Sequence, residues 1–229
     1  MTYKIVELFN SIEGEGIRAG KTATFIRLAG CNLRCTYCDT TYAFDVNAPT
    51  ITEMTADEIL EKVETAGYER VTLTGGEPLC TPGVEALIYQ LLSNEIEVNI
   101  ETNGSVDTAP LLNYLTVQKG LFVSDDLIFT MDYKLPSSGQ TQHMHIPNYD
   151  MLDSCDVLKF VVGSEEDVSA MLAFLQTLKS RPNIYIGAVY GQYDLQKLVQ
   201  HQLTQPLLID ATLQLQLHKI IWDPSATGV

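Results

Sequence analysis

The spacing of apolar residues changes along the chain between the period of a helix and that of a strand. Residues 55–67 (TADEILEKVETAG) predict the clearest helix, with one apolar face. Thr55 and Glu58 have the spacing of a capping box, and Gly67 is suited to end the helix. Further helices are predicted over residues 82–94, 165–180 and 193–203, and strands over residues 70–74, 97–102, 127–134, 157–162 and 183–190.

This order of strands and helices predicts a parallel sheet covered by helices, and hence an α/β fold. A complete eightfold barrel takes about 250 residues, whereas this chain has 229. We therefore expect an incomplete, opened (β/α) barrel that forms a single domain over residues 1–229. Residues 123–126 and 137–148 are expected to be surface loops, and the pattern over residues 213–221 fits a strand or a helix.

The charge balance restricts the partners. Acidic residues number 29 and basic residues 14, which gives a net charge of −15. Nucleic acids and anionic membranes are poor partners for such a surface, so a small-molecule or protein partner is expected. The sequence shows neither a long apolar run nor a signal peptide, which predicts a cytoplasmic protein. Thiols stay reduced there, and clustered cysteines then favour metal binding or chemistry.

Three cysteines follow a strand-like run, in the segment GCNLRCTYCDT over residues 30–40. Their spacing, Cys-x3-Cys-x2-Cys, suits a [4Fe–4S] cluster in which one iron lacks a protein ligand and is free to bind a small molecule. A zinc site is the alternative, with Cys80, Asp39 or a histidine as the fourth ligand. The spacing alone leaves both possibilities open.

The same segment resembles the radical S-adenosylmethionine superfamily, because Tyr37 directly precedes the last of the three cysteines. Residues 74–78 (TGGEP), after a predicted strand, are similar to the second signature of that superfamily, a glycine turn that lies along the methionine amino group. The resemblance implies an N-terminal cluster-binding loop and S-adenosylmethionine on the open iron. It also implies that the reduced cluster generates a 5′-deoxyadenosyl radical, so no catalytic side chain is assigned.

Residues 9–45 are similar to the N-terminal block of the 7-carboxy-7-deazaguanine synthases, in IEGEG (12–16), in Arg27 and in CDT (38–40). The downstream segments ETNG, MDYKLPSSG and QLHKIIW also match, so the resemblance covers most of the chain. It implies a carbon–nitrogen lyase of queuosine and 7-deazapurine biosynthesis. Such an enzyme contracts 6-carboxy-5,6,7,8-tetrahydropterin to 7-carboxy-7-deazaguanine, releases ammonia and uses S-adenosylmethionine catalytically.

The resemblance also implies site residues. The cluster ligands are Cys31, Cys35 and Cys38, and Thr40 is the ligand of a magnesium ion. The implied substrate-binding residues are Ile12, Glu13, Gly14, Arg27, Thr74 and His218. The implied cofactor-binding residues are Tyr37, Cys38, Asp39, Gly76, Asp132, Tyr133 and Lys134. A guanidinium fork suits a substrate carboxylate, and at position 13 glutamate stands where the family commonly has glutamine.

Simpler interpretations remain open for several of these residues. Arg27 alone fits a surface ion pair, Lys134 a solvated lysine, and His218 a packed C-terminal histidine. Residues 12–14 also fit a polar turn, and Thr40 a residue that turns the chain after the cysteines. The family further implies a reductase or flavodoxin as electron donor, and a homodimer. Two other functions remain as alternatives, a glycyl-radical-enzyme activase and a non-catalytic zinc-binding module. The IEGEG segment and Arg27 argue against the activase, whereas the metal content of the purified protein would distinguish the zinc-binding module.

Overall fold

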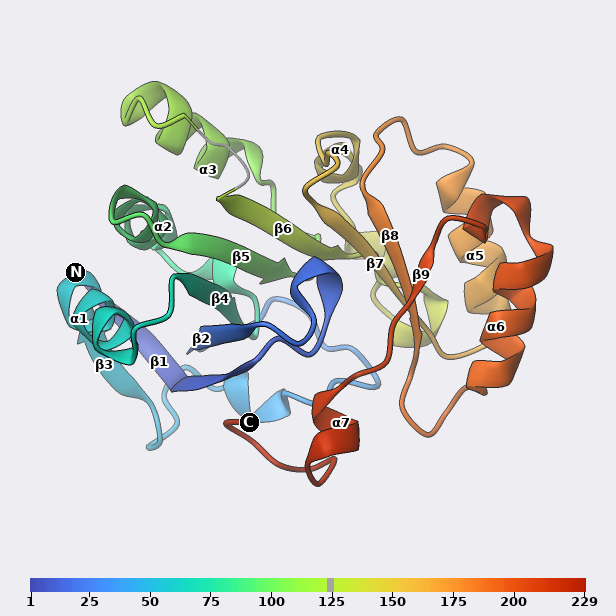
Figure 1. Ribbon diagram of the computed structural model, residues 1–229, viewed down its shortest axis with the longest axis horizontal. Coiled ribbons are helices and arrows are strands. Elements are labelled where there is room, and N and C mark those ends of the chain that lie inside the picture. Colours follow the sequence, from blue (N-terminus) through green and yellow to red (C-terminus); the bar gives the residue numbers. More distant parts are fainter. Residues whose placement is uncertain (123–125) are drawn as a thin grey trace.

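The fold is organised around one curved, open sheet (Figure 1). The computed structural model describes residues 1–122 and 126–229, so most of the loop expected at 123–126 lies outside the described residues. The strands are β1 (Thr2–Ile12), β2 (Thr22–Leu28), β3 (Thr52–Thr55), β4 (Arg70–Gly75), β5 (Glu97–Thr102), β6 (Leu127–Asp132), β7 (Val157–Val162), β8 (Asn183–Ala188) and β9 (Thr212–Leu213).

The strand order is β3-β1-β2-β4-β5-β6-β7-β8-β9. The pairs β1–β2 and β1–β3 are antiparallel, whereas every pair from β2–β4 to β8–β9 is parallel. In the described part of the chain β3 and β9 do not pair with each other, so the sheet stays open. The predicted incomplete (β/α) barrel is therefore confirmed.

Helices cover the outer face of this sheet (Figure 1). The helices of the fold are α1 (Ala56–Ala66), α2 (Val84–Ser93), α3 (Ala109–Asn113), α4 (Ile146–Asp150), α5 (Glu165–Leu175), α6 (Leu195–Thr204) and α7 (His218–Ile221). The last of them, α7, lies instead at the inner cavity, which its residues His218 and Lys219 line. The capping box of Thr55 and Glu58 is present at the start of α1, and Gly67 ends that helix in the left-handed conformation. These features confirm the helix that the sequence predicted most clearly.

The two faces of the central strands have different roles. Outward side chains such as Leu73, Ile100 and Phe160 are fully buried against the helices and form the core. Inward side chains at the strand ends, such as Glu101 and Lys159, instead line a cavity. Because side chains alternate along a strand, the same segments supply both the core and the site.

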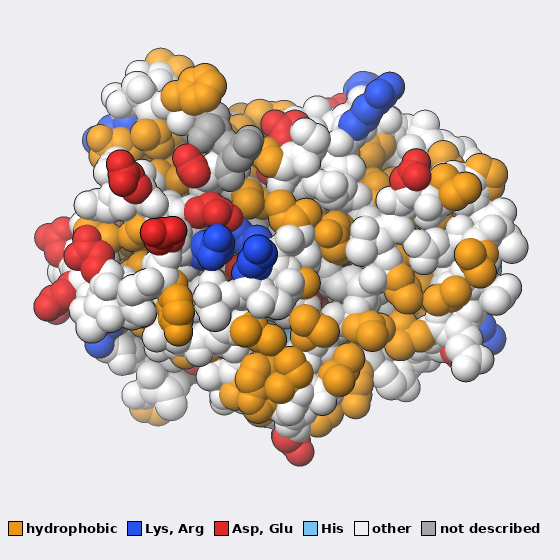
Figure 2. All heavy atoms as spheres, viewed as in Figure 1, with side chains coloured by type: hydrophobic (Ala, Val, Ile, Leu, Met, Phe, Trp, Pro, Cys, Tyr) orange, Lys and Arg blue, Asp and Glu red, His pale blue; other side chains and the backbone are white. Residues whose placement is uncertain are grey.

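Some elements differ from the prediction. The short helices over residues 136–150 replace a featureless loop. Residues 213–221 contain the end of β9 and the single turn of α7. Apolar side chains gather on the surface over α7 (Figure 2), where Ile220 is 62% and Ile221 52% exposed. No helix among the described residues has the length and apolarity needed to cross a membrane.

Candidate active site

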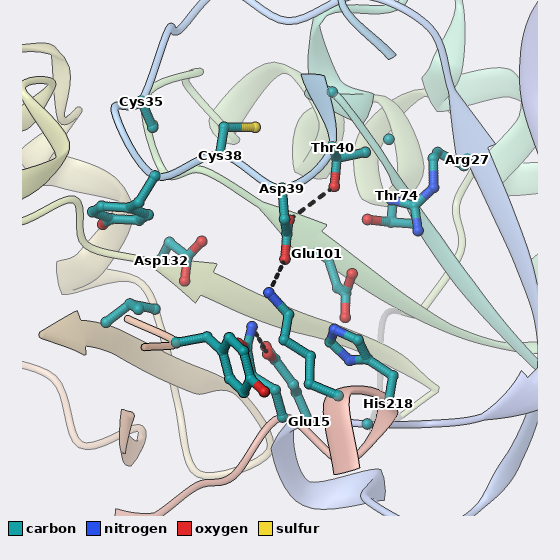
Figure 3. A pocket seen from close by; sticks show the side chains of 18 of the residues that line it. Glu15, Arg27, Cys35, Cys38, Asp39, Thr40, Thr74, Glu101, Asp132 and His218 are labelled. Atoms are coloured by element: carbon teal, nitrogen blue, oxygen red, sulfur yellow. Dashed lines mark hydrogen bonds and ion pairs between the residues drawn. The ribbon is translucent and has the colours of Figure 1, made fainter. Parts of the chain in front are cut away.

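The cavity lies at the C-terminal ends of the parallel strands and has a volume of about 600 Å³. Its walls come from the end of β1, the strand ends of β2 and β4–β7, and the residues from 31 to 40. The C-terminal residues 224–229 complete the lining. Figure 3 shows carboxylates, thiols, Arg27 and His218 around this space. The volume is in the range of sites that hold small molecules.

Residues 30–40, here called the cysteine loop, follow β2 directly. All three cysteines are half-buried, and each lines the cavity. Burial raises the pKa of the Cys31 and Cys35 thiols, so metal binding must displace their protons. The Leu33 backbone N–H lies 3.4 Å from Cys31 Sγ, and Asn103 Nδ2 lies 3.8 Å from it. Both donors are placed to stabilise a thiolate.

The three thiols fit a cluster better than a single ion. Thiolates on one tetrahedral zinc would lie about 3.8 Å apart, given a Zn–S bond of about 2.3 Å. Among residues 1–122 and 126–229, however, these three sulfur atoms do not form a group within 4.8 Å of one another. Cys80 is exposed and does not line the cavity. The three thiols of this one loop therefore suit a larger, multi-iron group, in which each cysteine binds a different iron.

The glycine turn after β4 packs directly on the cysteine loop. The Gly76 N–H donates to Leu28 O at 3.1 Å, and the Glu77 N–H donates to Gly30 O at 2.8 Å. A Cβ on Gly76 would lie 2.7 Å from the Cys31 Cβ, so only glycine allows this approach. Because Gly76 has no side chain, the backbone of the glycine turn beside the cysteine loop stays accessible to a ligand.

Glu77 holds the turn from within the protein. It is fully buried and accepts hydrogen bonds from Leu79 N, Thr102 Oγ1 and Asn103 N. Burial raises its pKa to about 7, although these hydrogen bonds act in the opposite direction. Glu77 thus joins the end of β4 to the end of β5 and does not face a ligand.

Asp39 contacts Thr40 within the cysteine loop and Lys219 of α7 outside it (Figure 3). Its Oδ1 accepts a hydrogen bond from Thr40 Oγ1 at 3.1 Å, and its Oδ2 lies 2.8 Å from Lys219 Nζ. Burial raises the pKa of Asp39, but the hydrogen bond and charge of Lys219 outweigh this and lower it. Asp39 is therefore ionised. Because the Thr40 hydroxyl donates its hydrogen bond to Asp39, its oxygen lone pairs are left for a cation.

A second charged group lies across the cavity, on β6 and β7. Lys134 Nζ lies 2.5 Å from Asp132 Oδ2, and its side chain is only 14% exposed. Lys159 forms ion pairs with Asp132 at 3.2 Å and with Glu15. Burial raises the pKa of Asp132, but Lys134 and Lys159 outweigh it and lower that pKa. Lys134 is accordingly not a solvated surface residue.

His218 lies beside Gly14, where a Cβ would come within 3.3 Å of its Nδ1. Burial lowers the pKa of His218 although Glu15 and Asp39 raise it, so the imidazole is neutral near pH 7. Arg27 faces Thr74 across the β2–β4 pair, and both side chains line the cavity (Figure 3). Arg27 also pairs with Glu7 at 2.8 Å.

Most of the predicted site residues meet in this cavity. They are Ile12, Gly14, Arg27, Cys31, Cys35, Tyr37, Cys38, Asp39, Thr40, Thr74, Gly76, Asp132, Lys134 and His218. Two do not. Glu13 is fully buried, and its carboxylate accepts from Thr72 Oγ1 and faces Arg18, away from the cavity. The Tyr133 ring stacks on Phe174 in the core, with 3.9 Å between ring centroids. These two side chains therefore do not reach the cavity, and a ligand contact at either residue would have to come from its backbone.

Other lining residues escaped the sequence analysis. Among them are Glu15, Glu101, Lys159, Gln216, Lys219 and the C-terminal residues 224–229. Lys159 did carry a signal, because it is the one charge in the apolar strand VLKFVV. With Arg27, Lys134 and Lys219 it brings four of the 14 basic residues to one cavity. Four carboxylates, Glu15, Asp39, Glu101 and Asp132, line the same cavity, so its charged side chains are balanced although the chain is acidic.

Comparisons with known proteins agree with this site. The sequence signature of the Radical SAM superfamily matches residues 25–117. The chain is 42% identical to the 7-carboxy-7-deazaguanine synthase of Clostridium acetobutylicum over the full length of both proteins. It is 36% identical to the synthase of Methanospirillum hungatei, over 96% of this chain and 86% of that protein.

The fold also matches a solved structure. The crystal structure of QueE from Escherichia coli superposes with a TM-score of 0.72 and covers 94% of both chains, at 23% identity. That likeness concerns the fold alone. The full-length sequence matches, with the three thiols and the glycine turn packed on them, show that the chain belongs to the 7-carboxy-7-deazaguanine synthase family of radical S-adenosylmethionine lyases.

Proposed function

We propose that the cavity binds 6-carboxy-5,6,7,8-tetrahydropterin and converts it to 7-carboxy-7-deazaguanine with release of ammonia. The observation that carries this proposal is Arg27, which lines the cavity together with Thr40 and Thr74. A guanidinium fork binds a carboxylate through two parallel hydrogen bonds. Arg27 would hold the substrate carboxylate, and Thr40 would hold a magnesium ion that neutralises its charge.

The cofactors follow from the family, and this cavity has groups for each. Cys31, Cys35 and Cys38 would hold the [4Fe–4S] cluster, and the turn at Gly76 would bind the methionine part of S-adenosylmethionine. Tyr37, Asp39, Asp132 and Lys134 would surround the remainder of this cofactor. When bound, cluster and cofactor supply the radical that removes a hydrogen atom from C6 of the pterin.

The remaining residues bind and orient the substrate. Glu15 and Glu101 are carboxylates that accept hydrogen bonds, as the N–H groups of a pterin require. His218, neutral near pH 7, offers one donor and one acceptor beside them. The C-terminal residues 224–229 line the same cavity, and they would exclude water from the reacting radical.

Anaerobic turnover tests the proposal. Purified protein receives the carboxypterin, S-adenosylmethionine, Mg²⁺ and a reductant, and ammonia and the deazaguanine product are measured. We expect both products in equal amounts, without net loss of S-adenosylmethionine. An activase of a glycyl-radical enzyme would leave the pterin unchanged. A zinc-binding module would be colourless and carry zinc, in place of about four irons per chain.

Further proposals concern the binding partners, the cellular localisation and the oligomeric state of the protein. We propose that residues 1–229 act as a single domain in the cytoplasm, receive electrons from a reductase or flavodoxin, and bind neither nucleic acid nor membranes. We also propose a homodimer, which the exposed Ile220 and Ile221 of α7 support as an apolar contact surface. Light scattering that gives the mass of one chain would contradict the dimer.

A further inference from the structure

Glu7 lies beside Arg27, on the neighbouring strand β1. The Nε–H of Arg27 donates to Glu7 Oε2 at 2.8 Å, and both side chains are 17% exposed. The hydroxyl of Tyr42 donates to the same carboxylate oxygen at 3.0 Å. Arg27 and Tyr42 line the cavity, whereas Glu7 does not. The carboxylate therefore contacts Arg27 beside the cavity, without lining it.

A bulge in β1 creates this contact. Ile5 is opposite Leu28 in the β1–β2 pair, and the register then shifts so that Glu7 is opposite Arg27. Without the extra residue, Val6 would take that position. Because directly opposite residues share one face of an antiparallel pair, the bulge exchanges an apolar neighbour of Arg27 for a carboxylate. Bulges commonly redirect side chains at functional sites.

The contact with Glu7 uses only one of the two hydrogen-bonding edges of the Arg27 guanidinium. Arginine has five N–H donors in a rigid plane and offers a carboxylate either its side edge, with Nε, or its end fork of two Nη atoms. Glu7 occupies the side edge. Hydrogen bonds between Arg27 and the other described residues use Nε alone. The end fork remains for a ligand in the cavity.

We propose that Glu7 is a positioning residue that fixes the side chain of Arg27 so that its end fork binds the carboxylate of the substrate. This inference rests on the proposed function, since it assumes a carboxylated substrate. Tyr42 assists by holding Glu7 in place. Burial raises the pKa of Tyr42 to about 12, although Arg27 lowers it, so the phenol stays a neutral donor over the physiological range.

The test compares two ligands in the absence of reductant and S-adenosylmethionine. Titration calorimetry on the anaerobic holoenzyme with Mg²⁺ measures the affinity for 6-carboxypterin and for pterin, which lacks the carboxyl group. Wild type should prefer the carboxylated ligand. Glu7→Ala should lower the affinity for 6-carboxypterin roughly tenfold, the scale of one charge-assisted contact, and leave the affinity for pterin unchanged.

Three further variants make the result specific. Glu7→Gln retains an acceptor for Nε–H and should lose only about threefold, and Tyr42→Phe should lose a similar amount. Glu61→Ala, which removes an exposed carboxylate of α1, should change neither affinity. Equal losses for both ligands in Glu7→Ala would show a purely structural role and overturn the inference, as would no loss at all. A wild type without preference for the carboxylated ligand would overturn the proposed function itself.

Discussion

Lys219 of α7 places its ammonium 2.8 Å from Asp39 Oδ2, so the last helix of the chain is tied to the cysteine loop. The lysine side chain is 10% exposed, and its ammonium also lies 5.3 Å from the centroid of the Tyr190 ring. The two contacts hold one wall of the cavity against another. A segment that the sequence leaves ambiguous is thus part of the site.

Lys219→Ala should loosen this wall. Loss of one partly buried ion pair costs about 1 kcal/mol, so amide hydrogens of α7 should exchange roughly fivefold faster. Hydrogen-exchange mass spectrometry of the C-terminal peptide measures the effect. Lys219→Arg should restore slow exchange, and Lys62→Ala, on the exposed face of α1, should have no effect. Unchanged exchange in Lys219→Ala would show that other contacts hold the helix.

Cys35→Ala should abolish the iron content and the brown colour of the anaerobically purified protein, because three thiolates from one loop hold the cluster. Cys80→Ala is the matched control, since Cys80 is exposed and outside the cavity. It should retain about four irons per chain. Iron analysis and electron paramagnetic resonance of the reduced protein measure both variants. A cluster that survives in Cys35→Ala would remove this cysteine from the ligand set.

Thr40→Ala should keep the cluster but raise the Mg²⁺ concentration needed for half-maximal turnover, roughly tenfold, because the hydroxyl that Asp39 polarises is lost. Thr40→Ser keeps the hydroxyl and should respond like wild type. Turnover is measured as a function of Mg²⁺ concentration, with iron analysis as a check on the cluster. An identical Mg²⁺ response in Thr40→Ala would exclude Thr40 as a ligand.

The sequence predicted the parallel strands and the cysteine loop well because their signals are local. Apolar runs identify the strands of a sheet that is covered by helices, and motif spacing identifies the thiols. Alternation along a strand could also have shown that the Tyr133 side chain does not line the cavity. Asp132 and Lys134 line it, and the residue between them points the opposite way.

Other parts of the site depend on contacts between distant segments. The direction of Glu13 follows from the loop over residues 13–21, in which the Glu13 N–H donates to Lys21 O and its carbonyl accepts from Gly20 N. The position of Glu7 follows from a bulge in β1. Neither has a local sequence signal, and the same holds for the C-terminal residues 224–229, which reach the cavity only through the fold.

Glu13 should make stability depend on pH. Burial raises its pKa from 4.5 to about 7, although Thr72 and Arg18 act in the opposite direction. A carboxyl with a raised pKa stabilises the folded protein fully below pH 4.5, and this contribution is lost as the pH rises through 7. Glu13→Gln stays neutral and keeps an acceptor for Thr72. Relative to this variant, wild type should lose on the order of 2–3 kcal/mol between pH 4.5 and pH 8.

Thermal unfolding of the anaerobic holoenzymes at several pH values measures this difference. The Tm of wild type should fall relative to that of Glu13→Gln by about 5 °C across the range. Other buried carboxyls with raised pKa values, such as Glu77 and Asp156, titrate in both proteins and cancel from the comparison. A constant Tm difference over this range would show that Glu13 is already ionised in the folded protein.

Gly76→Ala should separate the glycine turn from the cysteine loop. The new Cβ would lie 2.6 Å from the carbonyl carbon of Gly30 and 2.7 Å from the Cys31 Cβ. These atoms belong to the backbone or are attached directly to it, so the clash can be relieved only by moving the backbone. Overpacking of this kind costs about 1–3 kcal/mol. We expect a lower Tm and at least a tenfold loss of affinity for S-adenosylmethionine, measured by calorimetry.

Gly20→Ala separates this steric effect from the general cost of replacing a glycine. Gly20 has φ +82, but a Cβ there meets no atom within 4 Å. The substitution should therefore cost only the backbone strain of a left-handed alanine, about 1 kcal/mol, and leave the affinity for S-adenosylmethionine unchanged. If Gly76→Ala lowers Tm no more than Gly20→Ala and binds S-adenosylmethionine normally, then close packing between the turn and the cysteine loop is not required for cofactor binding.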